Sequence, residues 1–377
     1  MTEQAREESA DSKRRVSTLE LFFDLVFVFT LTQLTSLLES NPTWETAGQV
    51  LLIFVVLFWM YGGYAWLTNQ VPPENTHRRL LLIAAMAGFM VCALAAPGAF
   101  GDAGLAIGLG YLMVVLVHAG LYAESAGREV IRFAPFNLLG AAALIAASFV
   151  DGGFRYGLWL VPLGAQYLAA TVGRPPEPVT GYVLHSFHLV ERHGLLLIVA
   201  LGESVVAVGF GLGELTLDLG SYLGVVLGVG LAGALWWTYF LADDHLAERA
   251  LIASDSSSRL RKALGGFFYS YIPMLLGVVV LAAGVSHALG HFGERLDVTR
   301  ALLLAGGAAL YLLGNVAFRI AMGIRPLTIR AFGGVAALAT IFVGVAVSAG
   351  LQLVSLLLVL VVMLTWEMRG ETAAISS

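Results

Sequence analysis

Residues 16–38 read VSTLELFFDLVFVFTLTQLTSLL, an apolar stretch long enough to cross a bilayer as a helix. Two acids, Glu20 and Asp24, lie in its first turns, and Gln33 lies further in. A carboxylate within a membrane helix costs a few kcal/mol unless it finds a partner or water. The stretch therefore predicts a helix bundle that shelters these polar groups, and it makes Asp24 and Gln33 candidates for binding a substrate or a proton.

The composition of the whole chain indicates an apolar solvent. Of the 377 residues, 58% are hydrophobic and only 12% are charged, whereas soluble domains contain about 25% charged residues. The single cysteine, Cys92, excludes an internal disulfide and a cysteine-built metal site. We expect the lipid bilayer, a small solute and protons as partners, and no nucleic acid, metal or cofactor. The sequence leaves the oligomeric state open.

Apolar runs of membrane-spanning length recur along the chain, and turn signals such as Pro72-Pro73 and Gly152-Gly153 separate them. They predict an all-α polytopic membrane protein with about twelve transmembrane helices. The runs lie at 18–38, 46–67, 79–97, 103–123, 130–150, 154–172, 189–210, 219–241, 264–288, 299–321, 327–348 and 350–367.

The positive charges predict the orientation of these spans. If the N-terminus is cytoplasmic, 18 of the 21 Lys and Arg residues fall in inner segments, so both termini are expected on the cytoplasmic side of the membrane. The expected organisation has five parts. They are a disordered cytoplasmic tail (1–15), a first six-helix half (16–173), a cytoplasmic linker (174–188), a second six-helix half (189–367) and a cytoplasmic tail (368–377).

A weak internal repeat relates the two halves. Residues 20–33 can be laid over 191–204, and the aromatic run at 58–61 then corresponds to the run at 236–239. Six spans per half is an even number, so both halves have the same orientation in the membrane. The pattern predicts a parallel repeat about an axis along the membrane normal.

The two acids of the first span call for different interpretations. Ser17 and Glu20 fit a capping box, in which the glutamate reaches back to the amide of the N-cap residue. Asp24 lies too far inside the helix for a cap, so both a structural ion pair and a functional proton or substrate site remain open. If the first and seventh spans meet, we expect a contact of Asp24 with Arg192 or His193.

The seventh span begins with a charged cluster and contains a deeper acid. Glu191, Arg192 and His193 lie near its start, while Glu203 lies about 18 Å further along at the helical rise. A mid-membrane acid must face the bundle interior, be protonated or pair with a cation. All four residues are therefore candidates for binding a substrate or a proton. No compact metal motif accompanies them, and histidines here are more readily explained as interfacial residues or partners of Glu191.

Aromatic side chains gather at the ends of the second and eighth spans. Trp59 and Tyr61 belong to the first group, and Trp237 and Tyr239 to the second. They are compatible with an interfacial aromatic belt and with a wall that flanks a central cavity.

Five other polar side chains are embedded in apolar spans. Such groups more often join helices by hydrogen bonds than bind ligands. They are His118, Asn137, Gln166, Asn315 and Arg319.

Two of these stretches resemble a known family. The run from Glu20 to Thr35, with Asp24 and Gln33, resembles the first signature of the bacterial low temperature requirement protein A family. Glu191-Arg192-His193-Gly194, followed by Ala200 to Ser204, resembles the second signature. The likeness extends over residues 17–367 and implies a multi-pass inner-membrane protein. It implies no reaction.

Three functions fit these features. The parallel repeat, the embedded acids and the lack of a nucleotide-binding loop in the sequence favour a proton-coupled secondary transporter of a small solute. An intramembrane lipid-modifying enzyme could use His193 and Glu191 as acid and base, but the sequence contains no G-x-S-x-G motif. A membrane sensor or structural protein is the third alternative. We expect a transporter rather than an enzyme.

Overall fold

The computed structural model describes residues 15–125, 133–172, 184–212 and 219–375, and every secondary-structure element in these ranges is a helix. The chain divides into two compact units, which are described separately. The first contains residues 1–34 and 47–192, and the second contains residues 35–46 and 193–377. Residues 1–14 of the expected tail (1–15) and residues 174–183 of the expected linker (174–188) lie outside the described ranges.

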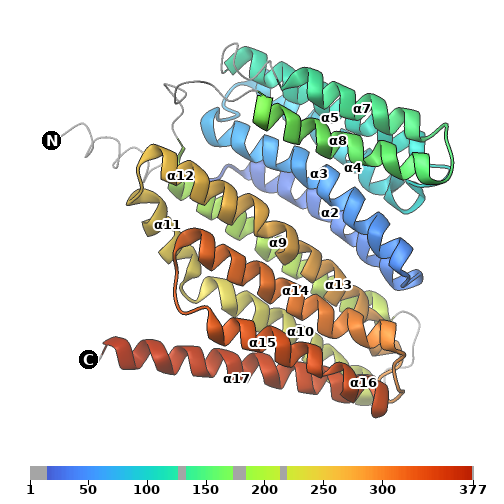
Figure 1. Ribbon diagram of the computed structural model, residues 1–377, viewed down its shortest axis with the longest axis vertical. Helices are drawn as coiled ribbons and strands as arrows, with labels where there is room; N and C mark the ends of the chain where they lie inside the picture. Colours follow the sequence, from blue (N-terminus) through green and yellow to red (C-terminus); the bar gives the residue numbers. More distant parts are fainter. Residues whose placement is uncertain (1–14, 126–132, 173–183, 213–218, 376–377) are drawn as a thin grey trace. The chain divides into compact units, whose positions relative to one another are not determined.

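The first unit is built on a row of packed helices. α4 packs on α5, α5 on α7 and α7 on α8 (Figure 1). Close approach of α4 and α5 requires glycine, because a Cβ atom on Gly110 would lie 3.0 Å from the carbonyl oxygen of Gly88. The helices are α2 (Thr18–Ser40), α3 (Trp44–Gln70), α4 (Thr76–Ala95), η1 (Ala96–Gly98), α5 (Gly104–Ser125), α7 (Ala134–Ala147), α8 (Gly153–Val172) and the start of α9 (Ser186–Leu212).

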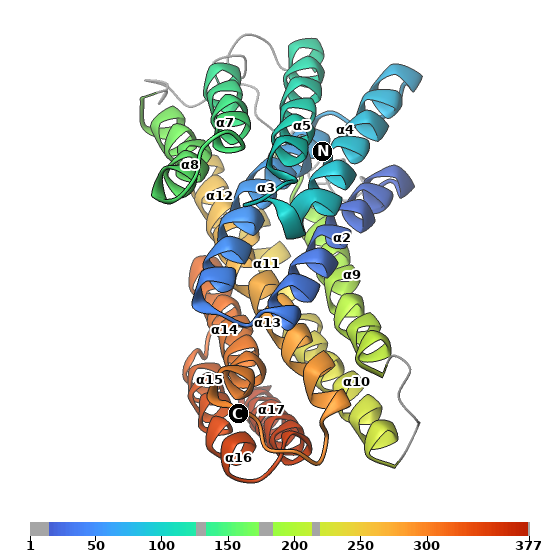
Figure 2. The same ribbon diagram turned by 90° about the vertical axis from the view of Figure 1, so that its right-hand side faces the viewer.

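The second unit has a similar arrangement around the hairpin of α13 and α14 (Figure 2). The two helices approach so closely that a Cβ atom on Gly277 would lie 2.5 Å from the amide nitrogen of Tyr311. α14 also packs on α15, and α17 packs on α10 and α15. The helices are α10 (Leu219–Phe240), α11 (Asp243–Ile252), α12 (Ser256–Ala263), η2 (Leu264–Tyr269), α13 (Tyr271–Gly290), α14 (Val298–Met322), α15 (Thr328–Ala339), α16 (Ile341–Ala346) and α17 (Ala349–Ile375).

Each of the twelve predicted apolar runs coincides with a helix or with helices that follow one another. Within the described ranges, nine helical segments are long and apolar enough to cross a membrane. α7 has only 14 residues and is shorter than the predicted run at 130–150. The total of twelve spans and the orientation of the termini stay predictions.

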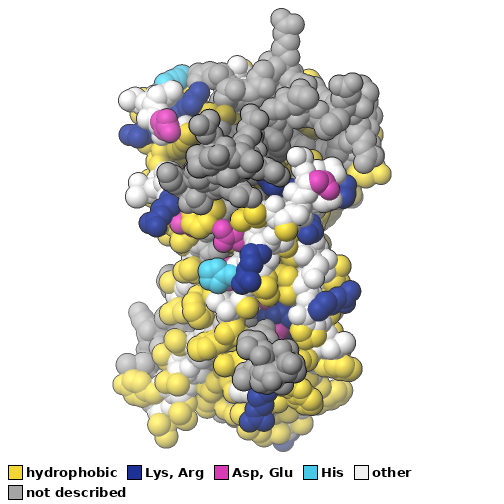
Figure 3. Space-filling model, turned by 90° about the vertical axis from the view of Figure 1, so that its left-hand side faces the viewer, with side chains coloured by type: hydrophobic (Ala, Val, Ile, Leu, Met, Phe, Trp, Pro, Cys, Tyr) yellow, Lys and Arg dark blue, Asp and Glu magenta, His cyan; other side chains and the backbone are white. Residues whose placement is uncertain are grey.

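Exposed side chains show how these helices differ from those of a soluble protein. On α2 the apolar Phe22 and Leu25 are about half exposed, whereas Glu20 and Asp24 on the same helix are buried. Yellow apolar side chains cover much of the face drawn in Figure 3. A soluble monomer rarely exposes so much apolar surface, so these faces indicate contact with lipid. The chain is a multi-pass helical membrane protein.

The polar stretch at 242–263 contains the two helices α11 and α12. Asp255 caps α12 by accepting a hydrogen bond of 2.8 Å from the amide of Ser258. This bond and those from the hydroxyls of Ser257 and Ser258 lower the pKa of the Asp255 carboxyl to about 2. The stretch is not wholly a surface feature, because Asp243 at the start of α11 is fully buried.

Candidate functional site

The carboxylates of α2 face the interior of the first unit. Glu20 is 2% exposed and Asp24 is 0% exposed, and the two residues are one helical turn apart. Their apolar neighbours on the opposite face are exposed, so lipid solvation selects this rotation of the helix. The turn that begins α2 thus places two acids side by side in a dry environment.

Arg192 of α9 pairs with both acids. Its Nη2 atom lies 3.0 Å from Oδ1 of Asp24, and its Nη1 atom lies 3.2 Å from Oε1 of Glu20. The Asp24–Arg192 contact expected from the sequence is therefore confirmed. Tyr61 of α3 donates a hydrogen bond of 2.8 Å to the same Asp24 oxygen, and Thr68 accepts one from Arg192. Oδ2 of Asp24 has no hydrogen-bond partner within the described part of the chain.

Glu20 is a cap and also an ion-pair partner. Its Oε2 atom accepts a bond of 2.9 Å from the amide of Ser17, while its own amide donates to the Ser17 hydroxyl at 3.3 Å. This is the capping box expected from the sequence. The other oxygen, Oε1, faces Arg192 and lies 3.1 Å from Nε2 of His188. The interpretation of Glu20 as a cap is thus incomplete, because capping uses only one of its two oxygens.

Asn69 determines the protonation of His188. The Asn69 amide is fixed in orientation, because Nδ2 donates to the carbonyl oxygen of His185 and Oδ1 accepts from the amide of the same residue. Nδ2 also lies 3.2 Å from Nδ1 of His188. A donor faces this ring nitrogen, so Nδ1 accepts, and the ring proton is on Nε2 toward Glu20. With this tautomer His188 is neutral, and its Nε2 atom lies 3.1 Å from Oε1 of Glu20.

We call Glu20, Asp24, Tyr61, His188 and Arg192 the α2–α9 cluster. With a neutral histidine it contains two carboxylates and one guanidinium. A net negative charge in a buried site is costly, and one added proton removes it. The cluster can thus exist in two charge states that differ by one proton.

The other predicted site residues lie elsewhere. Glu191 is half-buried and accepts a bond of 2.7 Å from the amide of Val16, and Gln33 is half-buried on α2. In the second unit, His193 packs against the rings of Phe267 and Tyr271, each with a centroid distance of 5.1 Å. Glu203 is 9% exposed on α9, as expected of an interior acid. The roles of these residues stay predictions.

The predicted aromatic groups divide into buried and exposed members. Tyr61 and Tyr239 are fully buried, Trp59 is half-buried and Trp237 is 44% exposed. Tyr61 joins the α2–α9 cluster through its hydroxyl. The exposed tryptophan is suited to an interfacial belt rather than to a cavity wall.

A second buried ion cluster was not predicted. In the second unit Asp243 pairs with Arg319 at 2.8 Å and with Arg330 at 2.6 Å, and Glu367 pairs with them at 2.5 and 3.1 Å, respectively. Asn315 accepts a further hydrogen bond from Arg330. All four charged residues are at most 1% exposed. This Asp243 cluster contains two acids and two arginines and is electrically balanced.

Three arginines of the predicted inner segments are buried in the two ion clusters. Arg192, Arg319 and Arg330 were counted as inner charges that set the orientation, but all three are buried in ion pairs. Asn315 and Arg319 lie four residues apart on one face of α14, and this spacing was the available signal. The acids that pair with Arg319, Asp243 and Glu367, lie in segments far away in the sequence, where no local pattern reveals them.

Polar residues in the other helices connect neighbouring elements. Gln166 of α8 donates a hydrogen bond to Asn137 of α7, which confirms the interhelical role expected for this pair. His118 is buried against the rings of Tyr64 and Tyr122. Among the residues that the structure describes, no group of three or more His, Cys, Asp or Glu side chains is placed to hold a metal ion.

Helices with lipid-facing apolar surfaces and interior charge clusters define a polytopic membrane protein. Comparison with known proteins gives the family. The family model described as bacterial low temperature requirement A protein (LtrA) matches residues 15–365, so this chain belongs to that family. It is also 30% identical over 333 residues to the uncharacterized protein RA0937 of Rhizobium meliloti (strain 1021), an alignment that covers 82% of this chain and 78% of that protein.

Proposed function

We propose that this protein is a proton-coupled secondary transporter of a small solute in the bacterial inner membrane, and that the α2–α9 cluster binds the proton. The observation that supports this proposal most strongly is the imbalance of charge in that cluster. Two carboxylates share one arginine, and Oδ2 of Asp24 has no hydrogen-bond partner within the described ranges. A proton on either acid neutralises the buried charge.

The Asp243 cluster serves as an internal comparison. It has the same number of acids, but two arginines balance them, and arginine does not lose its proton in proteins. A balanced cluster of this kind has no reason to exchange protons. The α2–α9 cluster has the neutral His188 in place of a second arginine, which leaves one proton position open. We therefore assign proton binding to the first cluster and a structural role to the second.

The proposed architecture has about twelve spans in two parallel six-helix halves, 16–173 and 189–367, joined by the linker 174–188. The order of packed neighbours supports it. In the first unit α4, α5, α7 and α8 pack in succession, and in the second unit α13, α14, α15 and α17 do so. These are the third to sixth helices of each proposed half. Parallel halves of this kind are a common basis for alternating access in secondary transporters.

The orientation can be tested with cysteine labelling. Cys92 is the single cysteine of the sequence, so a Cys92→Ala background leaves no competing thiol. The exposed positions Ser257 and Glu294 are then changed to cysteine one at a time. We expect a membrane-impermeant maleimide to label position 294 in intact cells and position 257 only after permeabilisation. The reverse pattern would overturn the proposal that the termini, including the tails 1–15 and 368–377, are cytoplasmic.

The geometry of α9 disfavours the enzyme alternative. Glu191 and His193 are two residues apart, so they point in directions about 200° apart around the helix. Glu191 is also bonded to the amide of Val16. An acid and a base that act on one reacting atom must converge on it, and these two side chains diverge.

Transport is tested in proteoliposomes that contain a pH-sensitive dye. Candidate solutes are chosen from metabolites whose levels change in a deletion strain, and solute-driven proton flux is measured. We expect flux with the native protein and its loss in Asp24→Asn, Glu20→Gln and Glu203→Gln. Asp151→Asn is the matched control, because that side chain is 95% exposed and should leave flux unchanged. Full proton coupling in all three variants would refute the proposal.

A further inference from the structure

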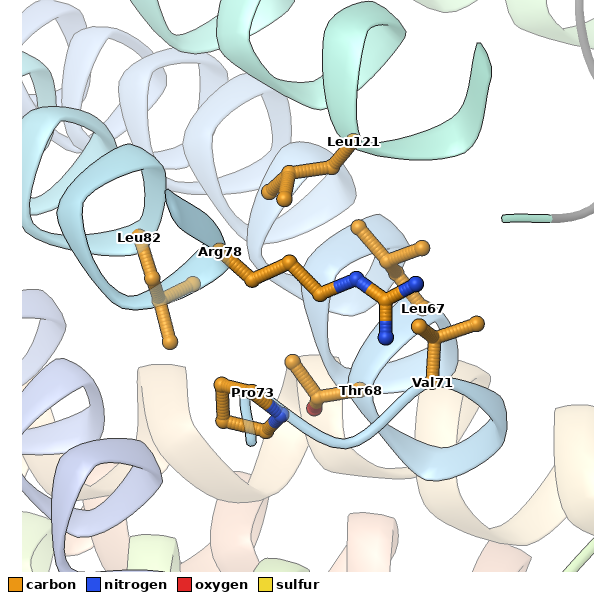
Figure 4. A pocket seen from close by; sticks show the side chains of 7 residues that line it. All are labelled: Leu67, Thr68, Val71, Pro73, Arg78, Leu82 and Leu121. Carbon is orange, nitrogen blue, oxygen red and sulfur yellow. The ribbon is translucent and has the colours of Figure 1, made fainter. Parts of the chain in front are cut away.

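A small pocket lies in the first unit where α3 ends and α4 begins. Its wall is mostly apolar, and the two polar side chains in it are Thr68 and Arg78. Figure 4 shows all seven lining residues: Leu67, Thr68, Val71, Pro73, Arg78, Leu82 and Leu121.

The side chain of Arg78 extends into this pocket. Its guanidinium group lies beside Leu67 and Val71 in Figure 4. The Nε atom is buried and has no hydrogen-bond partner among the residues that the structure describes. A buried donor of a charged group is costly to leave unsatisfied, so this Nε atom can bind an acceptor that the described residues do not provide.

The adjacent arginine shows that this arrangement is particular to Arg78. Arg79 is exposed, and its Nε atom donates a hydrogen bond of 3.0 Å to the carbonyl oxygen of Pro73. The backbone of Arg78 is also satisfied, since its amide donates to the side chain of Asn75 at 2.8 Å. Of these two arginines, Arg78 is therefore the one whose buried Nε atom has no hydrogen-bond partner among the described residues.

We propose that this pocket binds a phosphate oxyanion, and specifically the phosphate of an anionic lipid headgroup. Guanidinium groups match phosphate oxygens with two parallel hydrogen bonds. The ends of α3 and α4 lie at headgroup depth if both helices span the bilayer. This inference does not depend on the transport proposal.

Native mass spectrometry of the purified full chain tests the proposal. The probes are phosphatidylglycerol in mixed micelles and inorganic phosphate alone. The variants are Arg78→Gln and, as a matched control on the adjacent residue, Arg79→Gln. We expect the native protein and Arg79→Gln to retain one phosphatidylglycerol, and Arg78→Gln to bind it about tenfold more weakly, as for the loss of one charge-assisted hydrogen bond.

The outcomes distinguish the two sources of phosphate. Binding of lipid that millimolar inorganic phosphate does not displace identifies a headgroup site, whereas displacement by inorganic phosphate alone identifies a site for the free anion. Equal lipid retention in Arg78→Gln and Arg79→Gln would overturn the proposal, because it would indicate unspecific attraction to positive charge. Arg78→Lys is a second variant that keeps the test informative if Arg78→Gln does not fold. It keeps the charge but loses the Nε donor, so we expect its lipid affinity between those of the native protein and Arg78→Gln.

Discussion

Removing Arg192 tests the energetics of the α2–α9 cluster directly. In Arg192→Gln, the carboxylates of Glu20 and Asp24 stay 2% and 0% exposed without their shared cation. Loss of one partner of a buried ion pair typically costs about 3–5 kcal/mol. We expect the free energy of unfolding to fall by about this amount, unless one acid takes up a proton and limits the loss.

The same reasoning predicts the result for the double variant. Asp24→Asn with Arg192→Gln removes one negative and one positive charge together, and the remaining acid, Glu20, keeps its hydrogen bond from Ser17 and its contact with His188. We expect the double variant to be less destabilised than the sum of the two single variants. A coupling energy of about 1–3 kcal/mol would be typical of residues that are in direct contact.

The assay is reversible unfolding in detergent micelles, monitored by fluorescence, for the native protein, both single variants and the double variant. Arg300→Gln is the control, because its ion pair with Asp297 is 3.4 Å long and its side chain is 41% exposed. Exposed pairs contribute about 0–1 kcal/mol. If Arg192→Gln costs no more than Arg300→Gln, or if the single changes are additive, the α2–α9 cluster is not a coupled buried network.

Three further predictions concern the second unit. Arg330→Gln should lower the free energy of unfolding by about 3–5 kcal/mol, since it leaves Asp243 and Glu367 with one arginine, and should leave the pH dependence of proton flux unchanged. Gly277→Ala should destabilise by about 1–3 kcal/mol in thermal unfolding, because its Cβ atom would overlap Tyr311, whereas the control Gly233→Ala has open space and should not. The Asp255 cap has a lowered carboxyl pKa, so its stabilisation of α12 is present above the unfolded-state pKa of about 3.9 and is lost as the pH falls through about 2. Hydrogen exchange of the α12 amides at pH 5 should accordingly be faster in Asp255→Ala than in the native protein.

The sequence predicts the helices well because lipid imposes a simple length rule. A run of about 20 apolar residues between turn signals defines a helix regardless of its neighbours, and the run at 18–38 matches α2 closely. α7 shows the limit of this rule, because apolar residues continue beyond the 14-residue helix into the segments that flank it. Hydropathy gives the composition of a segment, and backbone hydrogen bonds determine where its helix ends.

The candidate site was predictable in part for a related reason. A carboxylate at the depth of Asp24 needs a cation, and Arg192 was the nearest choice in an apolar span. The role of Asn69 could not be predicted, because it depends on how its amide is oriented by the backbone of His185 in a distant segment. The Asp243 cluster was missed because Asp243 lies in a polar stretch, where an acid is expected to be solvated.

The two clusters also suggest why the charges are retained. Replacing a buried ion pair by apolar side chains is often neutral or stabilising, so stability alone does not explain four buried charges in the second unit. Each arginine of the Asp243 cluster contacts two acids from different helices, α11 and α17, and thereby joins them to α14 and α15. Ion pairs of this kind work in one alignment of the helices only, because sliding one helix by a turn would leave a charge unpaired in lipid. A protein built from many similar apolar helices needs buried ion pairs of this kind to fix the alignment of its helices. The ion pairs of the α2–α9 cluster can do the same, and this cluster also has one position that a proton can occupy.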